Sequence, residues 1–218
     1  MKFAVIQTLN YQFVDQFWMR INEIYLTTIN LVKEPLITWG QIYKENKVKA
    51  KLINDFLIPM SILIGVTTLF GNIFGGIVQA SVSFSYIVAS SIISFLLVFL
   101  EVYLAGWIIF MVAENFNPSV DSNKIFNLVI YSHTPVFLSM AFVKIFPQLY
   151  FVSLIGLYSI YIYWTGIELF SGFKSERKII FMILSGIVTI VLYLFLSYIF
   201  NWIYDALINE FTNFVSQL

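Results

Sequence analysis

The chain has 218 residues, of which 60% are apolar and only 11% are charged, and its mean hydropathy is +0.86. A soluble domain cannot cover so much apolar surface with polar side chains, so a lipid bilayer has to cover the excess. The formal net charge is zero, which implies no polyanionic partner such as a nucleic acid. Because the chain has no cysteine, disulfides, thiolate metal sites and cysteine nucleophiles are excluded.

The N-terminal segment, residues 1–55, holds seven of the twelve basic and five of the twelve acidic residues, and none of its windows is apolar enough to cross a bilayer. Its first fifteen residues are too polar for a cleavable signal peptide. Apolar side chains recur there at helical spacing: Phe13, Phe17, Ile21, Ile24 and Leu31. This pattern predicts an amphipathic helix, which could lie in the headgroup plane or pack on the membrane-spanning part.

A second short helix is predicted over residues 36–55, because Pro35 interrupts the first pattern. It ends in a basic cluster at the membrane surface: Lys44, Lys47, Lys49 and Lys51. Such a cluster satisfies the rule that positive charges stay on the cytosolic side, and specific recognition of lipid headgroups is a second interpretation.

Five apolar stretches follow, and each is long enough for one helix to cross about 30 Å of hydrocarbon. They cover residues 56–78, 84–112, 125–143, 149–170 and 179–203. The predicted fold class is therefore all-α, a polytopic bundle of five transmembrane helices with N-terminal amphipathic or interfacial helices. The expected division is a cytosolic or interfacial segment at 1–55, the membrane domain at 56–204 and a short outer tail at 205–218, into which the fifth helix could continue.

The orientation follows from the positive charges. The N-terminal segment and the loops after the second and fourth spans carry eleven Lys and Arg, whereas the opposite side carries only Lys144. This asymmetry predicts a cytoplasmic N-terminus and an outer C-terminus. Ten Lys to two Arg, with many Asn and Ile, indicate an AT-rich genome.

Two ionisable residues, Glu101 and His133, are predicted at similar depth, roughly 13 to 17 Å from the inner boundary at 1.5 Å per residue. Our hypothesis is that they share a polar interior with three further residues: Tyr131, Tyr161 and Glu168. The alternative is a protonated Glu101 that bonds to a serine, a tyrosine or a backbone carbonyl freed by Pro135.

Catalytic groups are scarce in the sequence. There is one histidine, and the zinc motif His-Glu-x-x-His, the Gly-x-Ser-x-Gly elbow and the phosphate-binding Gly-x-x-x-x-Gly-Lys loop are all missing. We therefore expect neither an enzyme nor a bound cofactor or metal.

Several short motifs occur together in a fixed order. The third span contains Tyr-Ser-His-Thr-Pro at 131–135, and Phe-Pro at 146–147 precedes a fourth span with Leu-Ile-Gly-Leu-Tyr-Ser-Ile-Tyr at 154–161. The positions that carry the pattern are Pro35, Trp39, Glu45, Pro59, Thr134, Pro135, Pro147, Gly156, Tyr158 and Gly166. Over about residues 30 to 200 this order resembles the Yip1 domain family. The chain departs from it at residues 113–117, where Ala-Glu-Asn-Phe-Asn replaces a glycine-bearing Phe-Gly-Gly, and Glu101 belongs to none of these motifs.

The resemblance implies a five-helix fold with a cytosolic N-terminus. Eukaryotic members of the family are associated with Rab-type GTPases, vesicle traffic and membrane shaping, and bacterial members are inner-membrane proteins. Together with the Lys-, Asn- and Ile-rich composition, the resemblance implies the cytoplasmic membrane of a bacterium, with the membranes of the ER or Golgi as the alternative. Two functions are therefore considered, a membrane scaffold that recruits a cytosolic protein through residues 1–55 and a small transporter or channel around Glu101 and His133. The expected partners are the lipid bilayer and a cytosolic protein, and self-association into a homo-oligomer is left open.

Overall fold

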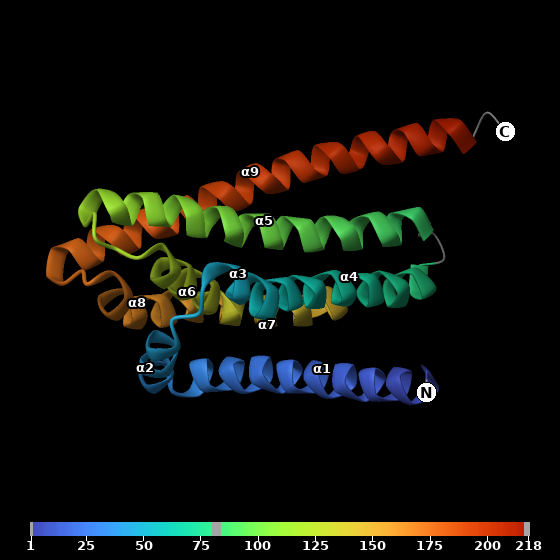
Figure 1. Cartoon of the computed structure of the whole chain (residues 1–218). Helices are drawn as coiled ribbons and strands as arrows, with labels where there is room; N and C mark the ends of the chain where they lie inside the picture. Colours follow the sequence, from blue (N-terminus) through green and yellow to red (C-terminus); the bar gives the residue numbers. More distant parts are fainter. Residues whose placement is uncertain (1, 80–83, 216–218) are drawn as a thin grey trace.

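The computed structural model describes the backbone of residues 2–79 and 84–215, and the side chains within 18–75 and 84–206. Every regular element in these residues is a helix (Figure 1). Five helical stretches are long and apolar enough to cross a membrane: Lys49–Gly75, Phe84–Phe116, Ser122–Ile145, Pro147–Ser171 and Ser175–Ala206. The prediction of an all-α protein with five spans is therefore confirmed.

The N-terminal segment does not contain one helix over residues 36–55, as predicted, but a break. α2 (Pro35–Glu45) ends at Asn46, whose left-handed backbone (φ 37°) turns the chain, and a new helix begins at Lys49. Asn tolerates this conformation better than most residues, so the helix stops there. The first span consequently starts several residues earlier than expected.

The first span begins with an irregular turn. The span as a whole consists of α3 (Lys49–Leu52), a π-helical turn (Ile53–Leu57) and α4 (Ile58–Gln79). Pro59 has no N–H, and its ring would clash with the carbonyl four residues earlier in a regular α-helix. The wider π turn directly before it relieves this clash.

The remaining spans follow in order. They are α5 (Phe84–Phe116), α6 (Ser122–Ser132) with α7 (Thr134–Ile145), a 3₁₀ segment (Pro147–Leu157) with α8 (Tyr158–Ser171), and α9 (Ser175–Val215). α4 packs on α5 and α7, α5 packs on α6 and α9, and α6 packs on α8. The last helix continues past the predicted membrane domain, and its side chains from residue 207 on lie outside the described part.

Large apolar side chains occupy both the interior and the outer surface. Buried examples from four helices are Ile64, Val102, Ile109, Leu128 and Phe137. On α8 and α9 exposed examples are Ile160, Leu169, Ile183, Ile187, Ile190 and Leu194. A continuous apolar surface of this kind needs lipid or protein to cover it. The chain is thus a multi-span membrane protein.

α1 (Lys2–Lys33) lies beside the bundle and contacts α7 and the π-helical turn (Figure 1). Leu31 is completely buried. The end of α1 thus packs on the bundle, whereas Ile21 of the same predicted apolar face is 40% exposed. The choice between a helix in the headgroup plane and one packed on the bundle stays a prediction. The side chains of Phe13 and Phe17 lie outside the described residues.

Candidate functional site at the junction of α2 and the bundle

Trp39 attaches α2 to the fourth span. Pro35 begins α2, and one turn later the Trp39 indole is only 1% exposed. Its Nε1–H donates to the carbonyl of Ile162 (3.0 Å) and to the Thr165 hydroxyl (3.2 Å). A buried tryptophan needs such a partner for its N–H, and here α8 supplies two.

Gly166 makes room for this tryptophan. A Cβ atom at this position would lie 2.9 Å from Trp39 Cε2 and 2.6 Å from Leu128 Cδ1, closer than carbon atoms can approach. The glycine therefore permits α2, α6 and α8 to meet at one point. Tyr158 adds a second tie, since its hydroxyl donates to the carbonyl of Val32 at the end of α1 (3.1 Å).

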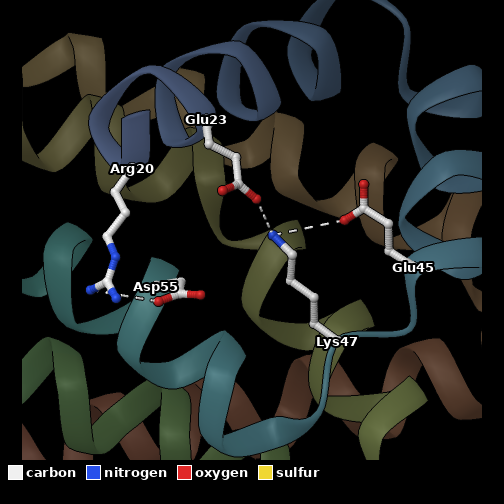
Figure 2. Close-up of polar contacts among 5 residues, drawn as sticks. All are labelled: Arg20, Glu23, Glu45, Lys47 and Asp55. Atoms are coloured by element: carbon white, nitrogen blue, oxygen red, sulfur yellow. Dashed lines mark hydrogen bonds and ion pairs between the residues drawn. The ribbon is translucent and has the colours of Figure 1, made fainter. Parts of the chain in front are cut away.

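Lys47 forms the centre of an ionic network between the N-terminal helices and the first span (Figure 2). Its Nζ lies 2.5 Å from Glu23 Oε1 and 3.8 Å from Glu45 Oε2. Nearby, Arg20 Nη1 lies 3.8 Å from Asp55 Oδ1. Burial alone would lower the pKa of Lys47, but interactions with Glu23 and Tyr131 outweigh it and raise this pKa above its ordinary value.

This network corrects the predicted basic cluster. Lys47 is turned into the protein with a side chain only 13% exposed, and Lys49 Nζ lies 4.9 Å from the centre of the Phe126 ring. Lys44 and Lys51 alone of the four point outward. The reason is the break at Asn46, which directs the following residues toward α6 instead of continuing one exposed helix face.

The Ser-His-Thr-Pro sequence at 132–135 closes the end of α6. Pro135 cannot donate to the carbonyl of Tyr131, and the Thr134 hydroxyl takes that acceptor instead (2.6 Å). His133 Nδ1 lies 2.7 Å from the carbonyl of Val129. The kink thus leaves these carbonyls satisfied, as a buried backbone requires. The carbonyl that Pro135 frees is therefore already occupied by a hydroxyl.

Glu101 and His133 lie close together inside the bundle. Glu101 Oε1 is 3.9 Å from His133 Nε2, and the side chains are only 9% and 12% exposed. Because a carbonyl can only accept, Nδ1 of His133 carries a proton, and Nε2 is the atom directed at the carboxyl group. The distance is too long for a direct hydrogen bond but short enough for a proton to be shared through one water.

The other members of the predicted polar interior lie elsewhere. Tyr161 is 47% exposed, and the Glu168 side chain is 51% exposed and forms an ion pair with Lys174 (3.6 Å). Their placement in the interior is therefore wrong, because the docking of Trp39 on α8 turns this face away from the core. Tyr131 is buried, but it packs on Phe56, with ring centres 4.6 Å apart.

Two motif residues lie in the 3₁₀ segment of the fourth span. Pro147 starts the 3₁₀ segment before α8. Gly156 is buried, and a Cβ atom there would lie 3.1 Å from Ser139 Oγ of α7. Their roles in the structure are thus a helix start and a close helix contact. Among the described residues no cluster of three or more His, Asp or Glu could hold a metal ion.

The model of the Yip1 domain matches residues 29–198. The chain belongs to the Yip1 family. Comparisons with curated proteins and with solved structures gave no match. The matched region begins just before α2, so the Trp39 attachment and the corner at Pro135 are both parts of the Yip1 domain, and both hold helices together rather than present reactive groups.

Sequence reasoning missed two participants of the junction. Glu23 lies in the predicted amphipathic helix and was not singled out there, although it binds Lys47. Asn127 is fully buried, and its Nδ2 donates to the backbone carbonyl of Lys47 (2.8 Å). An asparagine within a predicted span was the available signal, because a polar side chain at that depth requires a partner in the protein.

Proposed function

We propose that this Yip1 family member is a non-enzymatic membrane organiser that recruits a cytosolic protein partner through α2. The observation that carries the proposal is the firm attachment of α2 by Trp39, combined with exposed apolar side chains in the first turn of the same helix. Leu36 and Ile37 are 67% and 62% exposed. Because Trp39 fixes α2 to the bundle, these residues are already ordered before a partner binds. Binding therefore does not carry the entropic cost of ordering a free segment.

The proposal includes a location. The eleven-to-one distribution of basic residues favours α2 in the cytoplasm and the end of α9 outside, in the cytoplasmic membrane of a bacterium. α2 and the loops before α6 and α9 lie at the same end of the molecule (Figure 1). A cytosolic partner would therefore meet α2 together with Lys174 and the basic residues in the first turns of α6 and α9, Lys124 and Arg177.

A paired variant tests recruitment. Leu36→Asp with Ile37→Asp should abolish co-purification of the partner from mild detergent, because two charges replace the apolar contact. Lys33→Gln, an exposed change outside that face, should leave co-purification intact. If the double variant retains every protein that the parent retains, α2 is not the recruiting surface.

The buried pair Glu101 and His133 supports a second candidate function, a small transporter or channel. Ionisable groups at bilayer depth commonly mark ion pathways. Purified protein reconstituted in liposomes should conduct neither protons nor potassium above empty vesicles if it is an organiser. Flux that disappears in Glu101→Gln would establish the conducting function instead.

A further inference from the structure

A cavity of about 460 Å³ lies where three spans end, between the α5–α6 loop and the α8–α9 turn. Its wall includes Phe116, Phe173, Lys174 and Arg177. Phe116 is the last residue of the second span, and Ser175 is the first residue of the fifth. The cavity is therefore level with the ends of apolar helices, which is the height at which phospholipid headgroups lie in a bilayer.

The wall has a positive and an aromatic part. Lys174 and Arg177 supply two cations, and no acidic residue lines the cavity. Phe116 and Phe173 contact each other edge to face, with ring centres 5.8 Å apart. Phe173 is almost completely buried. Phe116 is therefore the ring whose partly exposed surface lies beside the two cations and can contact the first part of a lipid's chains.

The cations have little compensation from the protein. Lys174 pairs with Glu168 at 3.6 Å, but both side chains are more than half exposed, and such a pair is weak and screened by salt. Arg177 forms no ion pair with any residue in the described ranges. A guanidinium can bind a phosphate through two parallel hydrogen bonds, so it is the better anchor of the two.

Asn117 contributes a neutral donor. Its Oδ1 accepts hydrogen bonds from the Ser119 backbone N–H (3.2 Å) and hydroxyl (2.7 Å). The oxygen is thereby occupied, and the amide NH₂ is the end of this side chain that remains for a ligand in the cavity. Gly172 leaves the opposite rim open, because a Cβ atom there would meet nothing within 4 Å.

We propose that this cavity binds the phosphate group of an anionic phospholipid, with Arg177 and Lys174 as its ligands. A free phosphate ion carries the same anionic group and would be bound by the same two side chains. The position at the ends of the spans and the apolar wall favour the lipid, and basic pockets between transmembrane helices are known to hold anionic headgroups. The site is distinct from the predicted lysine cluster of residues 44–51 and from the recruiting face of α2.

Native mass spectrometry of the detergent-purified full chain tests the proposal. Dioleoyl phosphatidylglycerol and dioleoyl phosphatidylcholine are titrated separately. We expect one saturable phosphatidylglycerol per chain, bound at least tenfold more tightly than phosphatidylcholine. Arg177→Gln with Lys174→Gln should reduce phosphatidylglycerol binding at least tenfold, and Arg177→Lys should give an intermediate loss because the planar fork is gone.

The matched control is Lys51→Gln, which removes one exposed positive charge outside the cavity. It should bind phosphatidylglycerol as the parent does. Equal binding of both lipids, or unchanged binding by the double variant, would overturn the proposal. Inorganic phosphate is titrated in a third arm, and if it binds while phosphatidylglycerol does not, the assignment to a lipid is wrong.

Discussion

The attachment of α2 by Trp39 can be tested by removing the indole in two steps. Trp39→Phe keeps the aromatic contact with Phe170 (5.1 Å) but loses the hydrogen bond to the carbonyl of Ile162. The Thr165 hydroxyl also donates to this carbonyl (2.7 Å), so the acceptor stays paired, and losing the indole hydrogen bond costs about 0.5–1.5 kcal/mol. Trp39→Ala also empties the pocket, and truncation of a buried tryptophan costs about 3–5 kcal/mol.

Hydrogen exchange of the backbone amides in α2 measures this loss directly, because α2 must detach before its amides exchange. Each 1.4 kcal/mol corresponds to a factor of about ten. We therefore expect exchange about two- to twelvefold faster in Trp39→Phe and more than 100-fold faster in Trp39→Ala, up to the limit set by global unfolding. Amides of α5 should be unaffected below that limit.

Leu36→Ala is the matched control, since this side chain lies on the same helix but is 67% exposed. Its effect should stay within about 0.5 kcal/mol. Gly166→Ala tests the same contact from α8, because the added methyl group would overlap Trp39 and should cost about 1–3 kcal/mol. If Trp39→Ala exchanges no faster than Leu36→Ala, the indole does not hold α2.

Three further outcomes are expected. Thr134→Val should lower thermal stability by about 1–3 kcal/mol because it leaves the carbonyl of Tyr131 unpaired, whereas Thr134→Ser should be nearly neutral in the same melt. Gly71→Val should prevent folding, detectable as aggregation in size-exclusion chromatography, because a Cβ atom there would lie 1.8 Å from a backbone oxygen of α7; a monodisperse variant would contradict this close contact. In single-cysteine variants, a thiol at Gln148 should react with an impermeant reagent outside whole cells and one at Ser175 should not, and the opposite pattern would invert the proposed orientation.

The charge of Lys47 gives a prediction about pH. Its pKa is raised in the folded protein, so its stabilising contribution is complete below the unfolded value of about 10.4 and is lost only as pH rises through the folded value. Exchange of α2, corrected for the intrinsic rate, should therefore not change between pH 6 and pH 9. A Lys47→Met variant should exchange faster throughout that range, and equal exchange in both proteins would show that the ion pair with Glu23 contributes nothing.

The sequence was sufficient for the number and order of the spans, because a long apolar run has one stable arrangement in a bilayer. The family motifs also held information about contacts between helices. The large Trp39 indole can pack on α8 only where a residue without a side chain, here Gly166, leaves room for it. The rotation of each helix about its own axis, which decides which side chains face the core, could not be predicted in the same way. Tyr161 and Glu168 share a face with Thr165 by spacing, yet the contact of Trp39 with α8 leaves both at the surface.

The break at Asn46 illustrates a second limit. Helical spacing continues through residues 36–55, but one left-handed residue redirects Lys47 into the protein. Local pattern cannot show this, because the partner Glu23 lies on a different helix. By contrast, counting residues from the same end of the bundle predicted that Glu101 and His133 lie at similar depth, but not that their side chains face each other at 3.9 Å, as they do in the structure.

The central claim, recruitment of a cytosolic protein by α2, is tested most directly by photo-crosslinking in living cells. A benzoylphenylalanine placed at Ile37 should give one discrete protein adduct, which disappears when Leu36→Asp is added. The same probe at Gln148, at the opposite end of the fourth span, should not give that adduct. Adducts to lipid alone at Ile37, or the same protein adduct from both positions, would contradict recruitment through α2.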